Sequence, residues 1–233
     1  MMLSDDCVIV TGASGNLGAA VARTLAKQGA RLVCVDREAR RFEADGLDPD
    51  RLHWITGYDL SDRAAMAEVV AQALAHFGQI TGLVNCVGGF ATGRLLEGAA
   101  DQWDQMMTMN AKVAMVTTVA VLPALVAAGG GRIVHIAAQP GVKAAAGQAA
   151  YAASKAAVIR LIEAIAAEHR ADRITANCIL PGTIDTKSNR ESMPNAKPDI
   201  WIPPAAIADL IAFLISPAGA VVTGAAIPAT GLV

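Results

Sequence analysis

Tyr151 and Lys155 lie in the segment YAASK, inside a run whose apolar residues have helical spacing. One turn of helix separates them, so their side chains share a face. A free tyrosine has a pKa of roughly 10, which is high for acid–base catalysis near neutral pH. A neighbouring ammonium favours the phenolate, so we expect Lys155 to lower the pKa of Tyr151. The pair predicts a proton donor with electrostatic support.

A glycine-rich turn, TGASGNLG, follows an apolar strand-like run near the N-terminus and opens a helix-like run. Gly12 allows a tight turn, Gly18 allows close helix packing, and the free N–H groups of the helix can bind a pyrophosphate. This context predicts that the turn binds a dinucleotide. The expected binding residues are Gly12, Ser14, Gly15, Asn16, Leu17 and Gly18.

Asp36, at the end of the second predicted strand, bears on which dinucleotide binds. A carboxylate there can accept from the ribose 2′-hydroxyl of NAD and repels a 2′-phosphate, so we expect a preference for NAD. Arg37 beside it keeps NADP open as an alternative. Asp59 and Leu60 follow the third strand, where they could contact the adenine or simply form a turn.

Short apolar runs alternate with helical patterns along the whole chain, which predicts an α/β fold with a parallel sheet buried on both faces. Right-handed crossovers then give one doubly wound, three-layer, Rossmann-type domain over residues 1–233. A polar segment at 183–203 has the length of a substrate lid. The expected strands are 7–12, 31–36, 52–60, 82–89, 131–138, 174–182 and 225–229. The expected helices are 17–28, 61–77 with Ser61 as its N-cap, 99–108, 110–128, 151–169 and 204–215.

Composition limits the classes of partner. The chain is 54% hydrophobic and 17% charged, which allows a large core, and its net charge of -2 gives no sign of nucleic-acid binding. The uncharged stretch 113–131 contains Pro123 and a glycine run, so we interpret it as a buried helix and expect no membrane span. The four cysteines show no CxxC pairing, the residues show no metal-ligand spacing, and the N-terminus does not resemble a signal peptide. We expect a cytoplasmic protein without a metal.

Taken together, these motifs resemble the short-chain dehydrogenase/reductase family over essentially the whole chain. The matching segments, in order, are TGASGNLG, Asp59-Leu60, NCVG at 85–88, Asn110, YAASK and PGTIDT at 181–186. The resemblance implies a strand order of 3-2-1-4-5-6-7 and NAD(P)-dependent oxidoreduction of a small molecule. It also implies a homodimer or homotetramer that pairs through the helices from Asn110 and Tyr151.

The resemblance further implies roles for individual residues. Asn110 would hold a water in the proton relay, and Lys155 would also bind the nicotinamide ribose. The remaining cofactor contacts implied are Asn85, Val87, Gly88, Pro181, Gly182, Thr183 and Thr186.

Two departures from the family pattern stand out. Asn16 occupies the middle glycine position of the turn, which asparagine tolerates because it accepts positive φ better than most residues. Ala138 stands where the family has a serine that polarises the substrate carbonyl. Losing such a donor can cost on the order of 10²–10³ in rate. Either Gln139 replaces the donor, or the substrate needs none, or the chain binds cofactor without turnover.

The second explanation has support from a further resemblance, to quinonoid dihydropteridine reductases, which have alanine in place of the serine and keep the tyrosine and lysine. Their lid is similar to residues 185–204, and the implied substrate contacts are Asn189, Arg190, Met193 and Trp201. The alternative is that Arg190 is solvated and that Met193 and Trp201 only pack the lid. The C-terminal VTGAAIPATG instead resembles the 3-oxoacyl reductases and sugar or alcohol dehydrogenases. Near the site, His135 is interpreted as a hydrogen-bonded core histidine rather than a catalytic one.

Overall fold

A computed structural model describes residues 2–38, 42, 46–98 and 100–231. Seven parallel strands form one sheet in the order β3-β2-β1-β4-β5-β6-β7, which confirms the predicted topology. The strands are β1 (Cys7–Thr11), β2 (Arg31–Asp36), β3 (Leu52–Thr56), β4 (Gly82–Asn85), β5 (Gly131–Ile136), β6 (Ile174–Pro181) and β7 (Ala226–Ala229). The order reverses between β1 and β4, and in such sheets ligands bind outside the carboxyl ends of the strands at this point.

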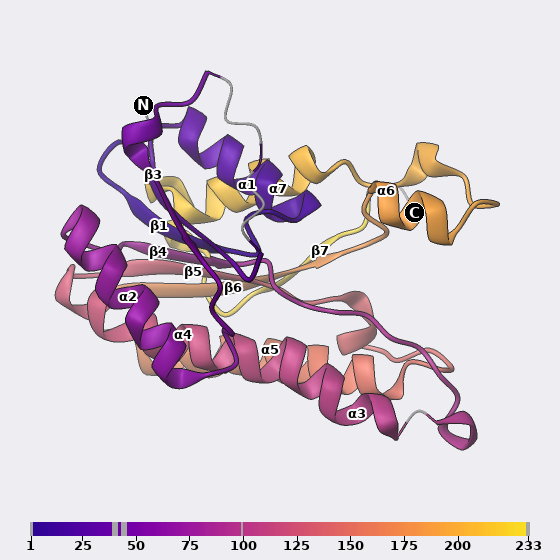
Figure 1. Ribbon diagram of the computed structural model, residues 1–233. Coiled ribbons are helices and arrows are strands. Elements are labelled where there is room, and N and C mark those ends of the chain that lie inside the picture. Colours follow the sequence, from indigo (N-terminus) through magenta and orange to yellow (C-terminus); the bar gives the residue numbers. More distant parts are fainter. Residues whose placement is uncertain (1, 39–41, 43–45, 99, 232–233) are drawn as a thin grey trace.

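Helices cover both faces of the sheet (Figure 1). Helices α1 (Asn16–Lys27) and α7 (Pro204–Ile215) pack on one face, and α2 (Arg63–Phe77), α4 (Val113–Ala127) and α5 (Ala149–Glu168) on the other. Successive strand side chains alternate between the two layers, because a strand repeats every two residues. Val8 and Val10 join the core under α1 and α7, whereas Ile9 joins the core under α2, α4 and α5.

The chain between β4 and β5 forms one helical run where two helices were expected. It consists of α3 (Asp101–Met106), a π-helical segment (Met107–Lys112) and α4. No glycine or proline separates the two predicted helices, and the helical run continues between them through the π-helical segment instead of breaking. Asn110 lies in this π-helical segment and is buried.

Other boundaries also differ from the sequence predictions. β3 ends at Thr56, because Gly57 follows with φ +89°, so Asp59 and Leu60 lie in a loop. The N-cap of α2 is Asp62 rather than Ser61, and its carboxylate accepts from the N–H of Ala64 at 2.7 Å. The lid is not a plain loop, because it contains the short helix α6 (Lys187–Ser192) and a 3₁₀ turn (Pro198–Ile200). Further 3₁₀ turns are Pro49–Arg51, Leu95–Glu97, Gln139–Gly141 and Pro217–Val221.

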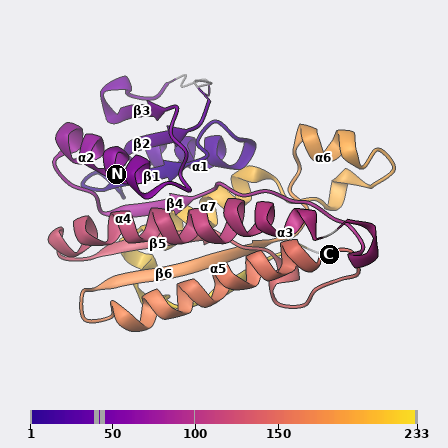
Figure 2. The same cartoon turned by 60° about the horizontal axis from the view of Figure 1, so that its bottom comes forward.

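The helical run Asp101–Ala127 is long and apolar enough, by length and composition, to cross a membrane. Its α4 part instead packs against β4, β5, α2 and α5, and Val113, Val121 and Leu125 belong to the core (Figure 2). This packing confirms the interpretation of the uncharged stretch as a buried helix.

Candidate active site

The glycine turn between β1 and α1 depends on contacts that only glycine allows. Gly12 has φ +66°, in the left-handed region. A Cβ at Gly18 would lie 2.0 Å from the carbonyl oxygen of Gly12, so the first turn of α1 closes directly onto the loop. Gly15 is the N-cap of α1. Asn16 is the first residue of the helix and does not have a positive φ, because among the described residues Arg173 is the only non-glycine residue that does. The turn therefore does not depend on the tolerance of asparagine for positive φ.

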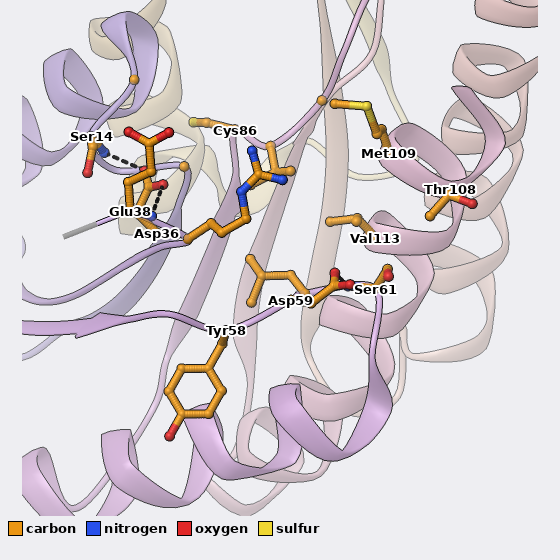
Figure 3. A pocket seen from close by; sticks show the side chains of 16 residues that line it. Ser14, Asp36, Glu38, Tyr58, Asp59, Ser61, Cys86, Thr108, Met109 and Val113 are labelled. Carbon is orange, nitrogen blue, oxygen red and sulfur yellow. Dashed lines mark hydrogen bonds between the residues drawn. The ribbon is translucent and has the colours of Figure 1, made fainter. Parts of the chain in front are cut away.

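A cavity of about 500 Å³ opens beside this turn, at the carboxyl ends of β1, β2 and β4 (Figure 3). Nine of the residues expected to bind the cofactor line it: Gly12, Ser14, Gly15, Asp36, Arg37, Asp59, Leu60, Val87 and Gly88. Sequence reasoning missed seven others, which are Glu38, Tyr58, Ser61, Cys86, Thr108, Met109 and Val113. Most of these follow a predicted strand or lie on the α4 side of the cavity. The expected residues that do not line it are Asn16, Leu17, Gly18, Asn85, Tyr151, Lys155, Pro181, Gly182, Thr183 and Thr186.

Two acidic residues bind loop N–H groups at the rim of this cavity. Asp36 accepts from the backbone N–H of Ser14 at 2.9 Å, which ties the end of β2 to the glycine turn (Figure 3). Asp59 accepts from the N–H of Ser61 at 2.9 Å, and this bond holds the pKa of its carboxyl below its usual range. Asp59 therefore stabilises a turn, which was one of its two expected roles, and it also lines the cavity.

The predicted acid–base pair lies on α5. Lys155 is buried, and its Nζ donates to the carbonyl oxygen of Ile136 at 2.9 Å and lies 5.9 Å from the ring centroid of Tyr151. Burial lowers the pKa of Lys155 to about 8 and raises that of Tyr151 to about 12. The expectation that Lys155 lowers the pKa of Tyr151 is therefore wrong for this structure, because burial of the phenol has the larger effect. Tyr151 carries its proton at neutral pH.

Asn110 connects three segments around Tyr151. Its Oδ1 accepts from the N–H of Gly89 at 2.9 Å, and its Nδ2 donates to the carbonyl of Gly89 at 3.1 Å and to Oγ of Ser154 at 2.9 Å. Ser154 in turn donates to the backbone carbonyl of Tyr151 at 2.8 Å. A Cβ at Gly88 would lie 2.8 Å from Oδ1 of Asn110 and 3.0 Å from Nζ of Lys155. Gly88 therefore lets the two polar side chains approach each other.

A second network stiffens the central strands beneath the site. Oδ1 of Asn85 accepts from Thr11, and its Nδ2 contacts Nδ1 of His135 at 3.0 Å. Nε2 of His135 contacts Thr118 on α4 at 2.9 Å. Burial, with a smaller effect of Lys155, lowers the pKa of His135 to about 3, so the ring is neutral. His135 is fully buried and bonded at both nitrogens, which confirms that it is a core histidine.

The side chain at position 138 is apolar and is buried away from solvent. Ala138 is buried in extended backbone conformation just before the 3₁₀ turn Gln139–Gly141. That turn packs on α5, where a Cβ at Gly141 would lie 2.8 Å from the carbonyl carbon of Lys155. Gln139 begins this turn and is partly buried, and none of the hydrogen bonds found among the described residues involves its side-chain amide.

The residues expected at the nicotinamide end lie where β6 leaves the sheet. Gly182 donates to the carbonyl of Ala229, and a Cβ there would approach Thr230 to 3.3 Å. The carbonyl of Thr183 accepts from Ile202, and Ile184 forms a parallel bridge with Ile202. Pro181 ends β6. These contacts fasten both ends of the lid.

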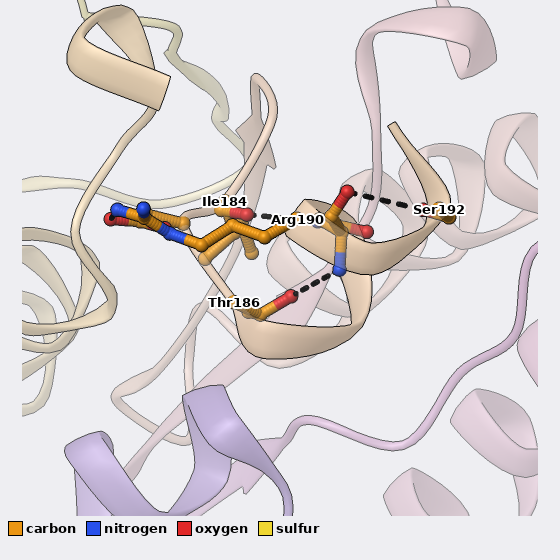
Figure 4. Close-up of polar contacts among 6 residues, drawn as sticks. Ile184, Thr186, Arg190 and Ser192 are labelled. Carbon is orange, nitrogen blue, oxygen red and sulfur yellow. Dashed lines mark hydrogen bonds and ion pairs between the residues drawn. The ribbon is translucent and has the colours of Figure 1, made fainter. Parts of the chain in front are cut away.

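Within the lid, most polar side chains already have partners (Figure 4). Thr186 caps α6 by accepting from the N–H of Asn189 at 3.1 Å, and Nδ2 of Asn189 donates to the carbonyl of Ile184 at 2.8 Å. Arg190 binds both carboxylate oxygens of Asp185, at 2.6 and 2.8 Å. Trp201 is buried, whereas Met193 is partly exposed. Arg190 is thus neither free nor merely solvated, and Trp201 packs the lid.

One aromatic contact to Tyr151 was not foreseen. The ring of Phe90 lies edge-to-face against Tyr151, with centroids 4.8 Å apart and planes at 86°. Phe90 follows Gly88 and Gly89 after β4 and is 62% exposed. A glycine pair after a strand, followed by an aromatic residue, was the available signal, because such a loop leaves the carboxyl edge of the sheet next to the site.

Comparisons with known proteins agree with this geometry. The family model described as short chain dehydrogenase matches residues 6–197. An uncharacterised oxidoreductase of Staphylococcus haemolyticus is 30% identical over 192 residues, covering 82% of this chain and 83% of its own. An acetoacetyl-CoA reductase of an Acinetobacter species is 29% identical over 245 residues, covering 99% and 98% of the two chains.

Solved structures show the same fold. The crystal structure of gox2181 superposes with a TM-score of 0.87 at 26% identity, over 98% of this chain and 95% of that one. A short-chain type dehydrogenase/reductase from Mycobacterium ulcerans gives a TM-score of 0.90 at 24% identity, over 99% and 90% of the two chains. The fold and site define an oxidoreductase of the Rossmann type. The chain belongs to the short-chain dehydrogenase/reductase family.

This family implies an NAD(P) cofactor, and the described residues fit one. The Gly12–Gly18 contact leaves no room for a side chain where a pyrophosphate would approach α1. The cavity continues from that turn past Asp36 to Asp59 and Leu60, as an adenosine half requires. Tyr151 and Lys155 lie beyond Gly88 from this cavity, on the side expected for the nicotinamide half.

Proposed function

We propose that the chain is an NAD-dependent reductase whose substrate accepts a hydride and a proton without a hydroxyl clamp, such as a quinonoid dihydropterin. The observation that carries this proposal is the buried Ala138, just before the turn that packs on α5, together with a partly buried Tyr151 that carries its proton. A quinonoid pterin gains aromaticity on reduction, so it needs less polarisation than a ketone does. The lid similarity at 185–204 adds support from the sequence.

In this mechanism the bound cofactor supplies the hydride. Tyr151 donates the proton: its phenol is protonated at neutral pH, and the proton moves to the substrate as hydride delivery builds negative charge there. Lys155 holds the cofactor ribose, and Asn110 keeps the start of α5 against the β4 loop. The glycine turn binds the pyrophosphate with Ser14, Gly15, Asn16 and Leu17, and Asp36 accepts from the adenosine ribose. Gly182, Thr183 and Thr186 border the nicotinamide end, and Gln139, Asn189 and Met193 face the substrate.

The test is oxidation of NADH in the presence of a quinonoid dihydropterin generated in the assay. We expect turnover by the parent protein and a loss of on the order of 10²-fold or more in Tyr151→Phe, in the range of removing a general acid. The comparison variant is Tyr58→Phe, which removes the other phenol hydroxyl of the chain. Tyr58 lines the cofactor cavity near Asp59 and accepts from Gln72 at 2.8 Å, so its loss should act on NADH binding and not on proton transfer. Full turnover by Tyr151→Phe would remove the tyrosine from the mechanism.

Carbonyl reduction is the second candidate function, and the free amide of Gln139 favours it. This side chain begins the turn after Ala138 and could donate to a substrate carbonyl in place of the serine. The similarity to an acetoacetyl-CoA reductase over nearly the whole length of both chains adds support. Turnover of 3-oxoacyl thioesters that is lost in Gln139→Ala would favour this candidate. Cofactor binding with no turnover over either substrate class would favour a sensor or a subunit without catalytic activity.

We also propose a homodimer or homotetramer in the cytoplasm. Met115, Val119 and Val126 are exposed apolar side chains on one stripe of α4, which supports pairing with a second copy. Free thiols at Cys7, Cys34, Cys86 and Cys178 fit a reducing compartment. Light scattering of the parent protein and of Val119→Arg tests the assembly, and a monomeric parent would contradict it.

A further inference from the structure

Phe90 and Tyr151 belong to one closed ring of contacts. Asn110 binds both backbone groups of Gly89, the residue before Phe90, and through Ser154 it also binds the backbone of Tyr151. The Phe90 ring then contacts the Tyr151 ring directly. One asparagine therefore sets the backbone on both sides of the aromatic pair.

The loop that carries Phe90 is fastened at its far end as well. The N–H of Gly93 donates to the carbonyl of Gly147 at 2.8 Å, just before α5. The side chain of Gln102 donates to the carbonyl of Thr92 at 3.2 Å. With Gly89 held at one end and Gly93 at the other, the position of Phe90 is fixed by its backbone, even though much of its side chain is exposed.

Exposed apolar side chains are common on protein surfaces, but the ring of this one contacts the predicted proton donor. Edge-to-face pairs contribute roughly 0.5–1.5 kcal/mol beyond the burial of their area. Leu95 and Leu96, on the same loop, are 74% and 99% exposed, so the loop carries other apolar side chains. Phe90 differs from them in its edge-to-face contact with the ring of Tyr151.

We propose that Phe90 is a positioning residue, which holds the ring of Tyr151 in one orientation and shields one side of it from water. This proposal rests on the proposed function only in naming Tyr151 as the proton donor. Because burial raises the pKa of this phenol above its ordinary value, removal of the Phe90 ring lets water approach and lowers the pKa of Tyr151 toward that value.

The chain has two tyrosines, Tyr58 and Tyr151, so the phenol can be observed directly. We suggest labelling the tyrosine Cζ carbon with ¹³C and recording NMR spectra from pH 8 to 10.5, with Tyr58→Phe to assign the Tyr151 signal. In the parent protein the Tyr151 signal should stay at the phenol position throughout, as expected for a pKa of about 12. In Phe90→Ala it should begin to move toward the phenolate position within this range.

Three variants act as controls. Phe90→Trp keeps an aromatic ring and should behave like the parent, Phe90→Leu keeps bulk without a ring and should lose the ring-current shift of the Tyr151 protons, and Leu96→Ala should change neither. An unchanged titration in Phe90→Ala together with unchanged Tyr151 proton shifts in Phe90→Leu would overturn the proposal. This measurement needs no substrate, so its failure is distinct from a failure of the proposed reaction.

Kinetics provide the second readout on any substrate that the parent protein reduces. Phe90→Leu should lower kcat by about two- to thirteenfold, the ratio that corresponds to 0.5–1.5 kcal/mol, with KM for NADH unchanged. Phe90→Trp should restore kcat to near the parent value. A raised KM for NADH with unchanged kcat would contradict positioning of Tyr151.

Discussion

Nζ of Lys155 donates to the backbone carbonyl of Ile136 at 2.9 Å, at the end of β5 and just before Ala137 and Ala138. The ammonium group of Lys155 thus binds the end of a strand, and its Nζ lies 5.9 Å from the ring centroid of Tyr151. Lys155 is buried and Tyr151 is partly buried, and this loss of contact with water disfavours the charged form of each. This explains why the pKa of the lysine is lowered and that of the tyrosine is raised. The buried lysine charge has a consequence for stability.

Replacing Lys155 by Met should make stability less dependent on alkaline pH. The folded-state pKa of about 8 lies below the ordinary lysine pKa of 10.5, so the unfolded chain binds more protons between these values. The stability of the parent protein should therefore rise with pH from 8 to 10.5 relative to Lys155→Met, by about 3 kcal/mol. Below pH 8 the full penalty of charging the buried lysine is present. Urea unfolding at pH 7.5 and 10.5 measures the difference.

Lys155→Arg is the matched control for this effect. Arginine stays charged over the whole window, so its stability relative to Met should not change between the two pH values. Both variants should lose turnover. If the free energies of unfolding of the parent protein and Lys155→Met differ by the same amount at pH 7.5 and at pH 10.5, Lys155 does not titrate between these pH values.

The glycine turn allows a graded test of close approach. A Cβ at Gly18 would meet the Gly12 oxygen at 2.0 Å, whereas one at Gly15 would meet the same atom at 3.2 Å. Gly18→Ala should therefore destabilise the protein by about 1–3 kcal/mol or more, as overpacking does, and weaken NADH binding strongly. Gly15→Ala should cost clearly less stability. Thermal unfolding and fluorescence titration with NADH measure both, and equal effects of the two variants would contradict the steric explanation.

Cofactor choice should depend on Asp36 more than on its neighbours. Its carboxylate binds Ser14 in the wall of the cavity, where the 2′-hydroxyl of the adenosine ribose would lie. Asp36→Ser should reduce the preference for NADH over NADPH by about ten- to a hundredfold, the range expected for a hydrogen bond to a charged group.

Glu38→Gln removes a carboxylate from the same cavity wall and should change this preference less. Dissociation constants for both nucleotides give the ratio. A larger change in Glu38→Gln than in Asp36→Ser would show that Glu38 rather than Asp36 selects the cofactor.

The sheet and the phosphate turn were predictable from the sequence, because they depend on local patterns. Val8, Ile9 and Val10 show the uninterrupted apolar character of a strand buried on both sides, and Gly12 and Gly18 have the spacing that the turn demands. The strand order then followed from the family resemblance and was confirmed.

Other features depend on contacts between distant segments, which no local pattern encodes. Asn110 lies in the π-helical segment, and its amide bonds there are to Gly89 and Ser154, which are far away in sequence. The Tyr151 pKa depends on how deeply α5 is buried, and the spacing to Lys155 alone gave the wrong direction. The pairing of Arg190 with Asp185 required the fold of the lid.

Restoring a hydroxyl at position 138 separates the two candidate functions. Ala138 has φ -165° and ψ 156°, which serine adopts without strain, and it is buried at the start of the turn beside α5. If the substrate is a quinonoid pterin, Ala138→Ser should leave its turnover unchanged and raise ketone turnover by on the order of 10²–10³. Ala137→Ser is the control, because Ala137 belongs to the core beneath the sheet and its hydroxyl should destabilise the fold without aiding ketone reduction. If Ala138→Ser gains nothing on ketones while Gln139→Ala abolishes an existing ketone activity, Gln139 is already the donor and carbonyl reduction is the function.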